Sequence, residues 1–279
     1  MSKNKLRQLR IFHEYYSRLK MLALSEFEYE GLPDSCSVRF LEDTLFHHGE
    51  AIFVDDEDLG FLTVKVTPSG TLNHYNESIS YRAFSTGYDK TFNAHDDRGK
   101  FVYIRNNYLA KSTDSSISIF AEKLTLIDLA ITVNINAQKT PLLIRTDKQT
   151  KISLEALLAQ YNDDALAIVA SKSLAEKPID VILTGAPFVA DKLREEKRAV
   201  WNEALEFLGF NTNPSDKKKE RLITNEVDAN NEQIDIQGAC LLLARQEFVK
   251  EINKKFNLNV TVRKRTDEER GVENGEIYD

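Results

Sequence analysis

Residues 133–141 read VNINAQKTP, and residues 186–209 read APFVADKLREEKRAVWNEALEFLG. Pro141 ends the apolar helical pattern that precedes it, because proline lacks the amide N–H that a helix interior needs. Pro187 suits the first turn of a new helix, and Gly209 suits its end. These two stretches therefore indicate the end of one long helix and the whole of another.

The first of these helices is expected over residues 115–138. One apolar face is made by Phe120, Leu124, Ile127, Ile131 and Ile135, and a second strip by Leu126, Leu129 and Val133. A helix with apolar residues on two faces packs against neighbours on both sides. At 1.5 Å per residue the two helices should be about 36 and 33 Å long.

The pattern of apolar residues changes several times along the rest of the chain. Residues 6–30 have helical periodicity that ends at Gly31 and Pro33. Short apolar runs between 51 and 106, separated by turns at 68–70 and at Gly87, predict a small antiparallel sheet or barrel. The acidic residues 55–58 are placed in a hairpin loop of it.

Between the two long helices we expect a compact α/β insert. It would hold strands at 142–145, 165–170 and 181–183 and a short helix at 153–161. After the second long helix come a polar loop over 211–223, a final helix over 225–256 that is broken or softened near Gly238, and a short strand at 259–262. The charged tail after Arg263 is predicted to be disordered.

Composition limits the function. The chain has 279 residues, 42% of them apolar, and a net charge of −7, so a wholly basic nucleic-acid-binding surface is excluded. Its two cysteines, Cys36 and Cys240, lack the spacing of a zinc site, and Cys240 is expected to be a small buried thiol. No signal peptide and no membrane-spanning run are recognisable.

Catalytic motifs are weak. The nearest approach to a phosphate-binding loop, residues 98–100, is followed by Phe101 and lacks the first glycine. Carboxylate pairs occur at 55–56, 96–97 and 163–164, where solvated loops are favoured over a metal site. The pair His47–His48 fits a loop or a helix end, and Trp201 fits a core or a subunit interface.

The two opening stretches resemble the stem of the portal proteins (upper collar, or head-tail connector) of phi-29-like podophages. There, NAQKTP, here residues 136–141, closes one stem helix, and a run like PFVADKL, here 187–193, opens the other. Further matching pieces are FEYE at 27–30, FLE at 40–42 and KKER at 218–221. The resemblance covers about 27–262, and both ends of this chain are shorter than those of the family.

The resemblance implies a mixed α+β, mainly α fold with long stem helices, a small α/β clip and a wing containing the small sheet. The expected parts are a wing (1–110), a stem helix (111–139), a clip (140–186), a channel-lining stem helix (187–210), a channel loop (211–224), and a wing or crown helix with a flexible tail (225–279). Copies of this subunit would close into a cyclic ring of about twelve.

The function that the resemblance implies is passage of double-stranded DNA through the ring during packaging and ejection, without catalysis, metal or cofactor. Implied partners are the packaging ATPase, the major capsid and scaffold proteins, and the lower collar or tail protein; binding of a packaging RNA is left open. The protein would be assembled in the host cytoplasm and reside at the portal vertex of the virion, with no membrane partner.

The expected site residues are basic side chains in an acidic protein. The candidates for the DNA channel are Lys192, Lys197, Lys217, Lys218, Lys219 and Arg221. In a ring each would form a circle of like charges, and a few such circles on an acidic wall would let DNA slide, because each neutralised phosphate tightens binding. The candidates for RNA binding are Lys3, Lys5, Arg7 and Arg10.

Other readings of these residues remain open. Without the resemblance, the lysines are a solvated helix face and a charged linker, and the N-terminal cluster is an ordinary helix start. The alternatives for the whole chain are a metal-dependent nucleic-acid-processing enzyme that uses a carboxylate pair, and a structural neck or collar protein that never passes DNA. Particle mass separates the first alternative from a ring.

Overall fold

The computed structural model describes residues 3–97, 99–139, 142–145, 180–183, 187–210, 224–265, 272–273 and 276–277. The chain divides into two compact units. The first unit combines Met1–Leu126 with Glu196–Asp279, and the second is Ile127–Glu195. The helix α3 (Asp114–Lys139) starts in the first unit and ends in the second.

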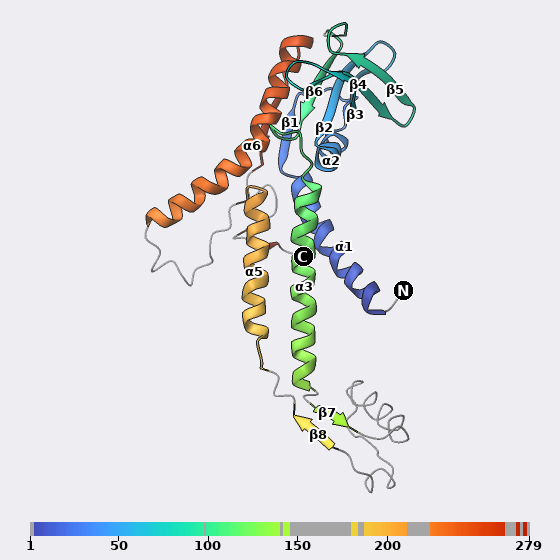
Figure 1. Ribbon diagram of the computed structural model, residues 1–279. Helices are drawn as coiled ribbons and strands as arrows, with labels where there is room; N and C mark the ends of the chain where they lie inside the picture. The colour runs from blue at the N-terminus through green and yellow to red at the C-terminus, as the bar shows by residue number, and fades with distance from the viewer. Residues whose placement is uncertain are drawn as a thin grey trace. The chain divides into compact units, whose positions relative to one another are not determined.

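The first unit contains the expected antiparallel sheet (Figure 1), with five strands in the order β5-β4-β3-β2-β6. The strands are β2 (Glu50–Asp56), β3 (Gly60–Leu72), β4 (Ser78–Ser85), β5 (Tyr88–Asn93) and β6 (Phe101–Arg105). Gly87 lies in the turn between β4 and β5, as predicted. The prediction of a turn at 68–70 is wrong, because these residues lie inside β3, where the register against β4 shifts between Ser69 and Leu72.

Two helices complete the core on this sheet: α2 (Val38–His48) and α6 (Thr224–Phe256). Phe53 of β2 is fully buried and lies 6.0 Å from Phe248 and 5.5 Å from Phe256, measured between ring centroids. Offset aromatic rings at such distances stabilise a core beyond the area they bury. The sequence analysis did not identify α2, although its ends carry ordinary signals.

Those signals are a serine cap and a glycine stop. The Ser37 hydroxyl accepts a hydrogen bond from the Phe40 amide, and Gly49 follows the last turn with a φ of 78°. A Cβ at Gly49 would also lie 2.4 Å from the Ala110 carbonyl oxygen, so only glycine fits there. His47 and His48 lie in the last turn of α2, which confirms their placement at a helix end.

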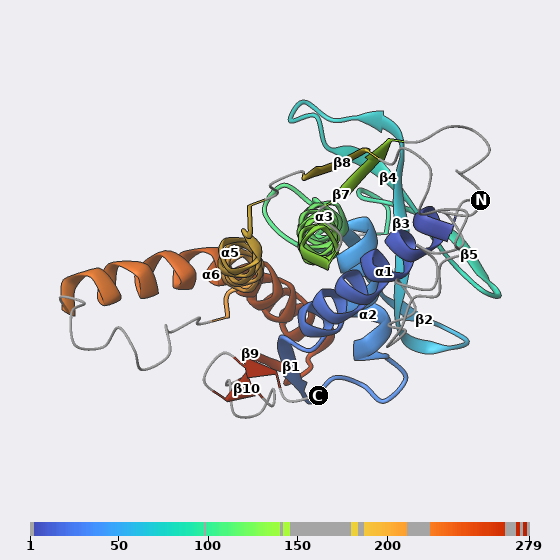
Figure 2. The same cartoon turned by 90° about the horizontal axis from the view of Figure 1, so that it is seen from below.

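The N-terminal helix is shorter than expected. It spans Lys3–Leu24 as α1, and Phe27–Glu30 is a strand, β1, not helix. This strand pairs antiparallel with β9 (Thr261–Lys264), which begins two residues later than predicted. Phe27 is almost fully buried, and Glu28 forms an ion pair with Arg263 opposite it. Seen from below, α1 lies alongside α2 (Figure 2).

The long helices agree with the sequence. The expected helix over 115–138 is α3, and the expected helix after Pro187 is α5 (Ala190–Phe207), which starts three residues later than predicted. Gly209, with a φ of 75°, follows the end of α5. Within the first unit, the Phe120 ring of α3 lies 5.8 Å from the Phe207 ring of α5.

In the second unit, β7 (Leu142–Arg145) pairs antiparallel with β8 (Asp180–Leu183), which confirms two of the expected strands. Asn134 of α3 holds the start of the returning chain: its Nδ2 donates to the Pro187 carbonyl at 2.9 Å, and its Oδ1 accepts from the Val189 amide at 3.1 Å. The helix predicted at 153–161 and the strand predicted at 165–170 lie outside the described residues.

Three further expectations need correction. The helix α6 runs from Thr224 to Phe256 as one continuous helix, so the break allowed near Gly238 does not occur, although the helix bends part-way along its length (Figure 1). Part of the tail is ordered, because β10 (Val272–Glu273) pairs with β11 (Glu276–Ile277). Cys240 is exposed instead of buried, whereas Cys36 is buried, and burial raises the pKa of Cys36 to about 11. In the described part of the chain, no helix combines the length and apolar character that crossing a bilayer requires.

Candidate functional site

The two α5 lysines have different surroundings. Lys192 is exposed, whereas Lys197 is half-buried with its Nζ 5.3 Å from the centroid of the Tyr15 ring in α1. A cation at this distance is attracted by the negative face of the ring. Lys197 therefore helps hold α1 against α5 as well as carrying charge. The other four channel candidates, Lys217, Lys218, Lys219 and Arg221, lie outside the described residues.

The candidate RNA-binding residues lie on the exposed first part of α1. Lys5, Arg7 and Arg10 are all exposed, and Lys3 is the first residue of the helix. The three-residue spacing of Arg7 and Arg10 places them on the same face of the helix. Leu6 is also exposed, so this part of α1 carries both apolar and basic side chains on its surface.

Two of the three carboxylate pairs, 55–56 and 96–97, lie in the described part of the chain, where one side chain of each pair binds other groups of the protein. Asp56 is buried, which corrects the expectation of a solvated loop: it binds Lys90 at 2.5 Å and accepts the Asp58 amide. Asp97 accepts the Asn93 amide in a turn. No cluster of three potential metal ligands occurs among the described residues, and residues 163–164 lie outside them.

The sequence analysis missed a buried polar centre at Arg245. Its guanidinium binds the Glu42 carboxylate through two hydrogen bonds, Nε to Oε1 at 2.9 Å and Nη2 to Oε2 at 2.5 Å. Asn106 accepts from it twice, through its carbonyl and its side chain, both at 3.2 Å. The Tyr29 hydroxyl donates to Glu42 at 2.7 Å, and the Phe27 ring lies 4.1 Å from the guanidinium carbon.

This centre joins β1, α2, α6 and the loop after β6 at one point. Burial alone would lower the pKa of Arg245, but the Glu42 carboxylate raises it above its ordinary value, so the guanidinium stays charged. Burial also raises the pKa of Tyr29 and keeps its hydroxyl a donor. An arginine within an apolar run, after residues 241–244, was the sequence signal for this centre.

A second polar cluster joins α1, α2 and α3. Lys20 Nζ lies 2.7 Å from Asp43 Oδ1 and 2.8 Å from His47 Nε2, and His47 Nδ1 lies 3.2 Å from Asp114 Oδ2. The Tyr16 hydroxyl donates to Asp114 at 2.7 Å. Burial works against ionisation of Asp43, but Lys20 lowers its pKa overall. Each of these side chains has a partner on another helix, so the cluster fixes the three helices together.

An exposed apolar stripe runs along α3. Ile119, Leu126 and Val133 are each between 53% and 67% exposed and follow one another at seven-residue intervals. Seven residues make about two helical turns, so the three side chains share one face. Ile117 and Leu124, on the other side of the helix, are fully buried. Within one copy of the chain, this stripe is left to solvent.

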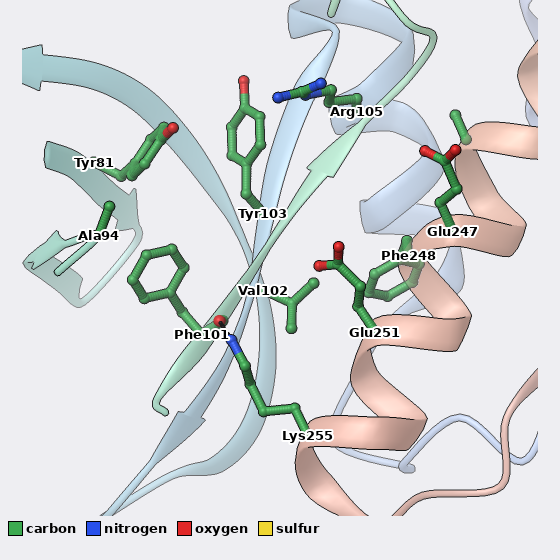
Figure 3. A pocket seen from close by; sticks show the side chains of 11 residues that line it. Tyr81, Ala94, Phe101, Val102, Tyr103, Arg105, Glu247, Phe248, Glu251 and Lys255 are labelled. Carbon is green, nitrogen blue, oxygen red and sulfur yellow. Dashed lines mark hydrogen bonds between the residues drawn. The ribbon is translucent and has the colours of Figure 1, made fainter. Parts of the chain in front are cut away.

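A pocket of about 340 Å³ lies between the sheet and α6 (Figure 3). Tyr81, Phe101 and Tyr103 line it from the sheet, and Glu247 and Glu251 line it from α6. The Glu251 carboxylate extends from α6 toward Val102 of β6 (Figure 3). The pocket has an aromatic wall on the sheet and a polar wall on α6, where Lys255 accompanies the two glutamates.

The comparisons with known proteins identify a family. The family model described as Phage Connector (GP10) matches residues 1–268. Among solved structures, the portal and tail of native bacteriophage P68 aligns over 97% of this chain and 94% of that chain, at 14% identity and a TM-score of 0.46. An HK97 family phage portal protein from Corynebacterium diphtheriae aligns over 95% of both chains, at 9% identity and a TM-score of 0.48. The virion of a native gene transfer agent particle aligns over 94% of this chain and 84% of that chain, at 9% identity and a TM-score of 0.44. Because these structures are at most 14% identical to the chain and their TM-scores lie below 0.5, the assignment depends on the family model.

Proposed function

Because this chain belongs to the phage connector family, and is therefore a phage portal protein, we propose that about twelve copies close into a ring around double-stranded DNA. Phage portal proteins are structural components of the virion at a capsid vertex. DNA packaging follows from membership of the family. The ring and its size are our proposal for this chain.

The observation that carries the proposal is the stripe of Ile119, Leu126 and Val133 on α3. Apolar side chains repeated every seven residues are typical of helices that pack lengthwise against another helix. Burying one large aliphatic side chain stabilises a contact by about 1.5 to 3 kcal/mol. In a ring, every copy would cover this stripe with the next copy, and no copy would be left with it exposed.

The inner surface would act on DNA through isolated basic positions. We keep Lys192, Lys197, Lys217, Lys218, Lys219 and Arg221 as candidates, with Lys192 the more available of the two on α5. The net charge of −7 per chain makes the ring acidic overall, so DNA would be held at a few points and would slide between them. The exposed basic residues of α1 would serve a packaging RNA.

The partners follow from the stages of capsid assembly. The ring would start the head shell with the major capsid and scaffold proteins, dock the packaging ATPase while DNA enters, and later seat the lower collar of the tail. In this proposal the wing, stem, clip and channel-loop divisions keep the boundaries expected from the sequence. Assembly would take place in the host cytoplasm.

Ring formation can be tested by native mass spectrometry and electron microscopy of the purified full chain. We expect hollow rings for the parent and only small species for Leu126→Lys, because the substitution places a charge in a buried seam. Leu59→Lys is the matched control, since Leu59 is an exposed leucine in the turn after β2. A parent that stays monomeric at micromolar concentration with scaffold and capsid proteins present would refute the proposal, as would normal rings from Leu126→Lys.

The DNA contacts can be tested in packaged heads. Replacing Lys217, Lys218 and Lys219 together with alanine should leave ring formation and thermal stability within about 0.5 kcal/mol of the parent. DNA should enter the heads, because the ATPase supplies the force, and then leak out once the motor leaves. Retention of full-length DNA, or loss of ring assembly, would show that this segment is a structural linker.

A further inference from the structure

The loop between β6 and α3 exposes two large apolar side chains side by side in the sequence. Tyr108 is 88% exposed and Leu109 is 72% exposed. Single exposed apolar residues are common on protein surfaces. An adjacent tyrosine and leucine with nearly all of their surface in water form a protrusion, here called the Tyr108–Leu109 knob.

The backbone under the knob is held by a dense set of hydrogen bonds. The Asn107 Oδ1 accepts the amides of Leu109 and Lys111, both at 3.1 Å, and its Nδ2 donates to the Lys111 carbonyl at 2.8 Å. Asn106 Nδ2 donates to the same carbonyl at 2.9 Å and to the Thr113 hydroxyl at 2.9 Å. Asn106 in turn belongs to the buried Arg245 centre.

The base of the loop is equally confined. The Ala110 backbone has a φ of 52°, and its carbonyl lies where a side chain on residue 49 would be, so Gly49 allows the close approach. A loop fixed in this way loses little conformational entropy when the knob is buried against a partner. Such pre-organisation strengthens binding without further contacts. The loop is therefore rigid and exposes apolar side chains, as expected of a loop that binds a partner.

A pocket with matching chemistry lies on the same unit. Its sheet side offers the rings of Tyr81, Phe101 and Tyr103, and its α6 side offers the carboxylates of Glu247 and Glu251. Its volume of about 340 Å³ is at the lower end of the range for sites that enclose a small ligand, roughly 300 to 1,000 Å³. One aromatic and one aliphatic side chain are of the right size for it.

The polar groups of the pocket suit a phenol. A tyrosine hydroxyl both donates and accepts hydrogen bonds. The two glutamates can accept from it, and Arg105, which also lines the pocket, can donate to it. Arg105 is already oriented by Glu77 at 3.4 Å and by the Tyr103 ring, 5.5 Å from the guanidinium carbon.

We propose that the Tyr108–Leu109 knob of one copy enters the pocket between the sheet and α6 of the next copy. The contact joins two different surfaces, so it is heterologous and repeats around a ring until the ring closes. The inference rests on the proposed ring and adds a specific lock between neighbouring copies. An assembly of identical copies supplies a pocket for every knob without a further protein.

The test uses assembly of the purified full chain, followed by light scattering and native mass spectrometry. The knob variant is Tyr108→Ala with Leu109→Ala, and its control is Tyr75→Ala with Leu72→Ala, because Tyr75 and Leu72 are also highly exposed on a turn of the sheet. We expect the knob variant to raise the concentration for half-assembly by about 30-fold or more, as for a residue pair central to an interface. The control should assemble like the parent, and both variants should keep the parent's melting temperature at a concentration where none of the three proteins assembles.

The pocket variant is Ala94→Trp, which adds bulk at the rim beside Tyr81 (Figure 3), and its control is Thr91→Trp on the exposed side of β5. We expect Ala94→Trp to block assembly and Thr91→Trp to leave it unchanged. A mixture of the knob variant and the pocket variant should give one-to-one dimers and no rings. Each dimer would use the intact pocket of the first variant and the intact knob of the second.

The outcomes separate this inference from the proposed function. Parental rings together with normal rings from the knob variant would overturn the inference and leave the proposed function standing. A defective knob variant with a normal Ala94→Trp variant, or a mixture that stays monomeric, would also overturn it, because the knob would then bind elsewhere. If the parent protein never forms rings, both the knob–pocket contact and the proposed ring are refuted.

Discussion

Two arginine–carboxylate pairs in the first unit have the same geometry in opposite surroundings. In Arg245–Glu42 and in Arg82–Asp89, Nε donates at 2.9 Å and Nη2 at 2.5 Å. The side chains of the first pair are 3% and 2% exposed, and those of the second are 59% and 56% exposed. Equal hydrogen-bond distances therefore accompany very different electrostatic situations, since water and salt screen only the second pair.

A third pair lies between these extremes. Asp56 has a side chain only 2% exposed, whereas that of its partner Lys90 is 49% exposed. The hydrogen bond from Lys90 lowers the pKa of Asp56, with help from the amides of Asp58 and Leu59 and against the effect of burial. The three pairs differ in their access to water, and the third also has a lysine in place of the arginine.

The largest effect is expected at the buried pair. Arg245→Met leaves Glu42 buried without its partner, and the free energy of unfolding should fall by about 3 to 5 kcal/mol. Urea denaturation would measure this loss, with parent and variant compared in the same state, either both monomeric or both assembled. Arg245→Met with Glu42→Leu should regain more than half of the loss, because no unpaired charge remains. If Arg245→Met lowers the free energy of unfolding by less than about 1 kcal/mol, the buried pair is no stronger than an exposed pair.

An intermediate, pH-dependent effect is expected at Asp56. Its folded pKa is lowered, so the pair contributes stability above the unfolded pKa of about 3.9 and loses it as the pH falls through the folded value. Asp56→Asn should therefore reduce stability by roughly 1 kcal/mol at pH 7. The gap between parent and variant should close as the pH falls below about 4. A gap that is constant between pH 7 and pH 2 would show that the charge of Asp56 is unimportant.

The smallest effect is expected at the exposed pair. Arg82→Ala should leave the denaturation midpoint unchanged within error at physiological salt, because solvent screens both charges. Comparison at low and high salt provides the check. A clear loss of stability for Arg82→Ala, similar to that for Arg245→Met, would mean that geometry and not burial sets the strength of these pairs.

The sequence predicted the features that depend on neighbouring residues. The apolar periodicity of α3 and the glycine after α5 need only local information, and both helices lie close to their expected positions. The strands β7 and β8 also follow from short apolar runs. The start of α5 was misplaced because Asn134 of α3 binds the Pro187 carbonyl and the Val189 amide, and the hydrogen bond from the Leu193 amide to the Val189 carbonyl comes only after them.

The errors occur where a distant partner decides the structure. Phe27–Glu30 continues the helical pattern of α1 but forms a strand, because Thr261–Lys264 supplies its hydrogen bonds. Glu42 and Arg245 are 203 residues apart, so neither position alone identifies the buried centre. The exposure of Cys240 likewise depends on which face of α6 meets the sheet.

The pairing of β1 with β9 has a consequence for synthesis on the ribosome. The first strand of the protein emerges early, yet its hydrogen-bonding partner ends at Lys264. The first unit cannot close until translation has passed that residue, because domains fold as units once their parts are available. The pocket wall on α6 also appears only near the end of translation. If copies join through this pocket, as proposed, nascent chains on one messenger would not join one another until each subunit is finished.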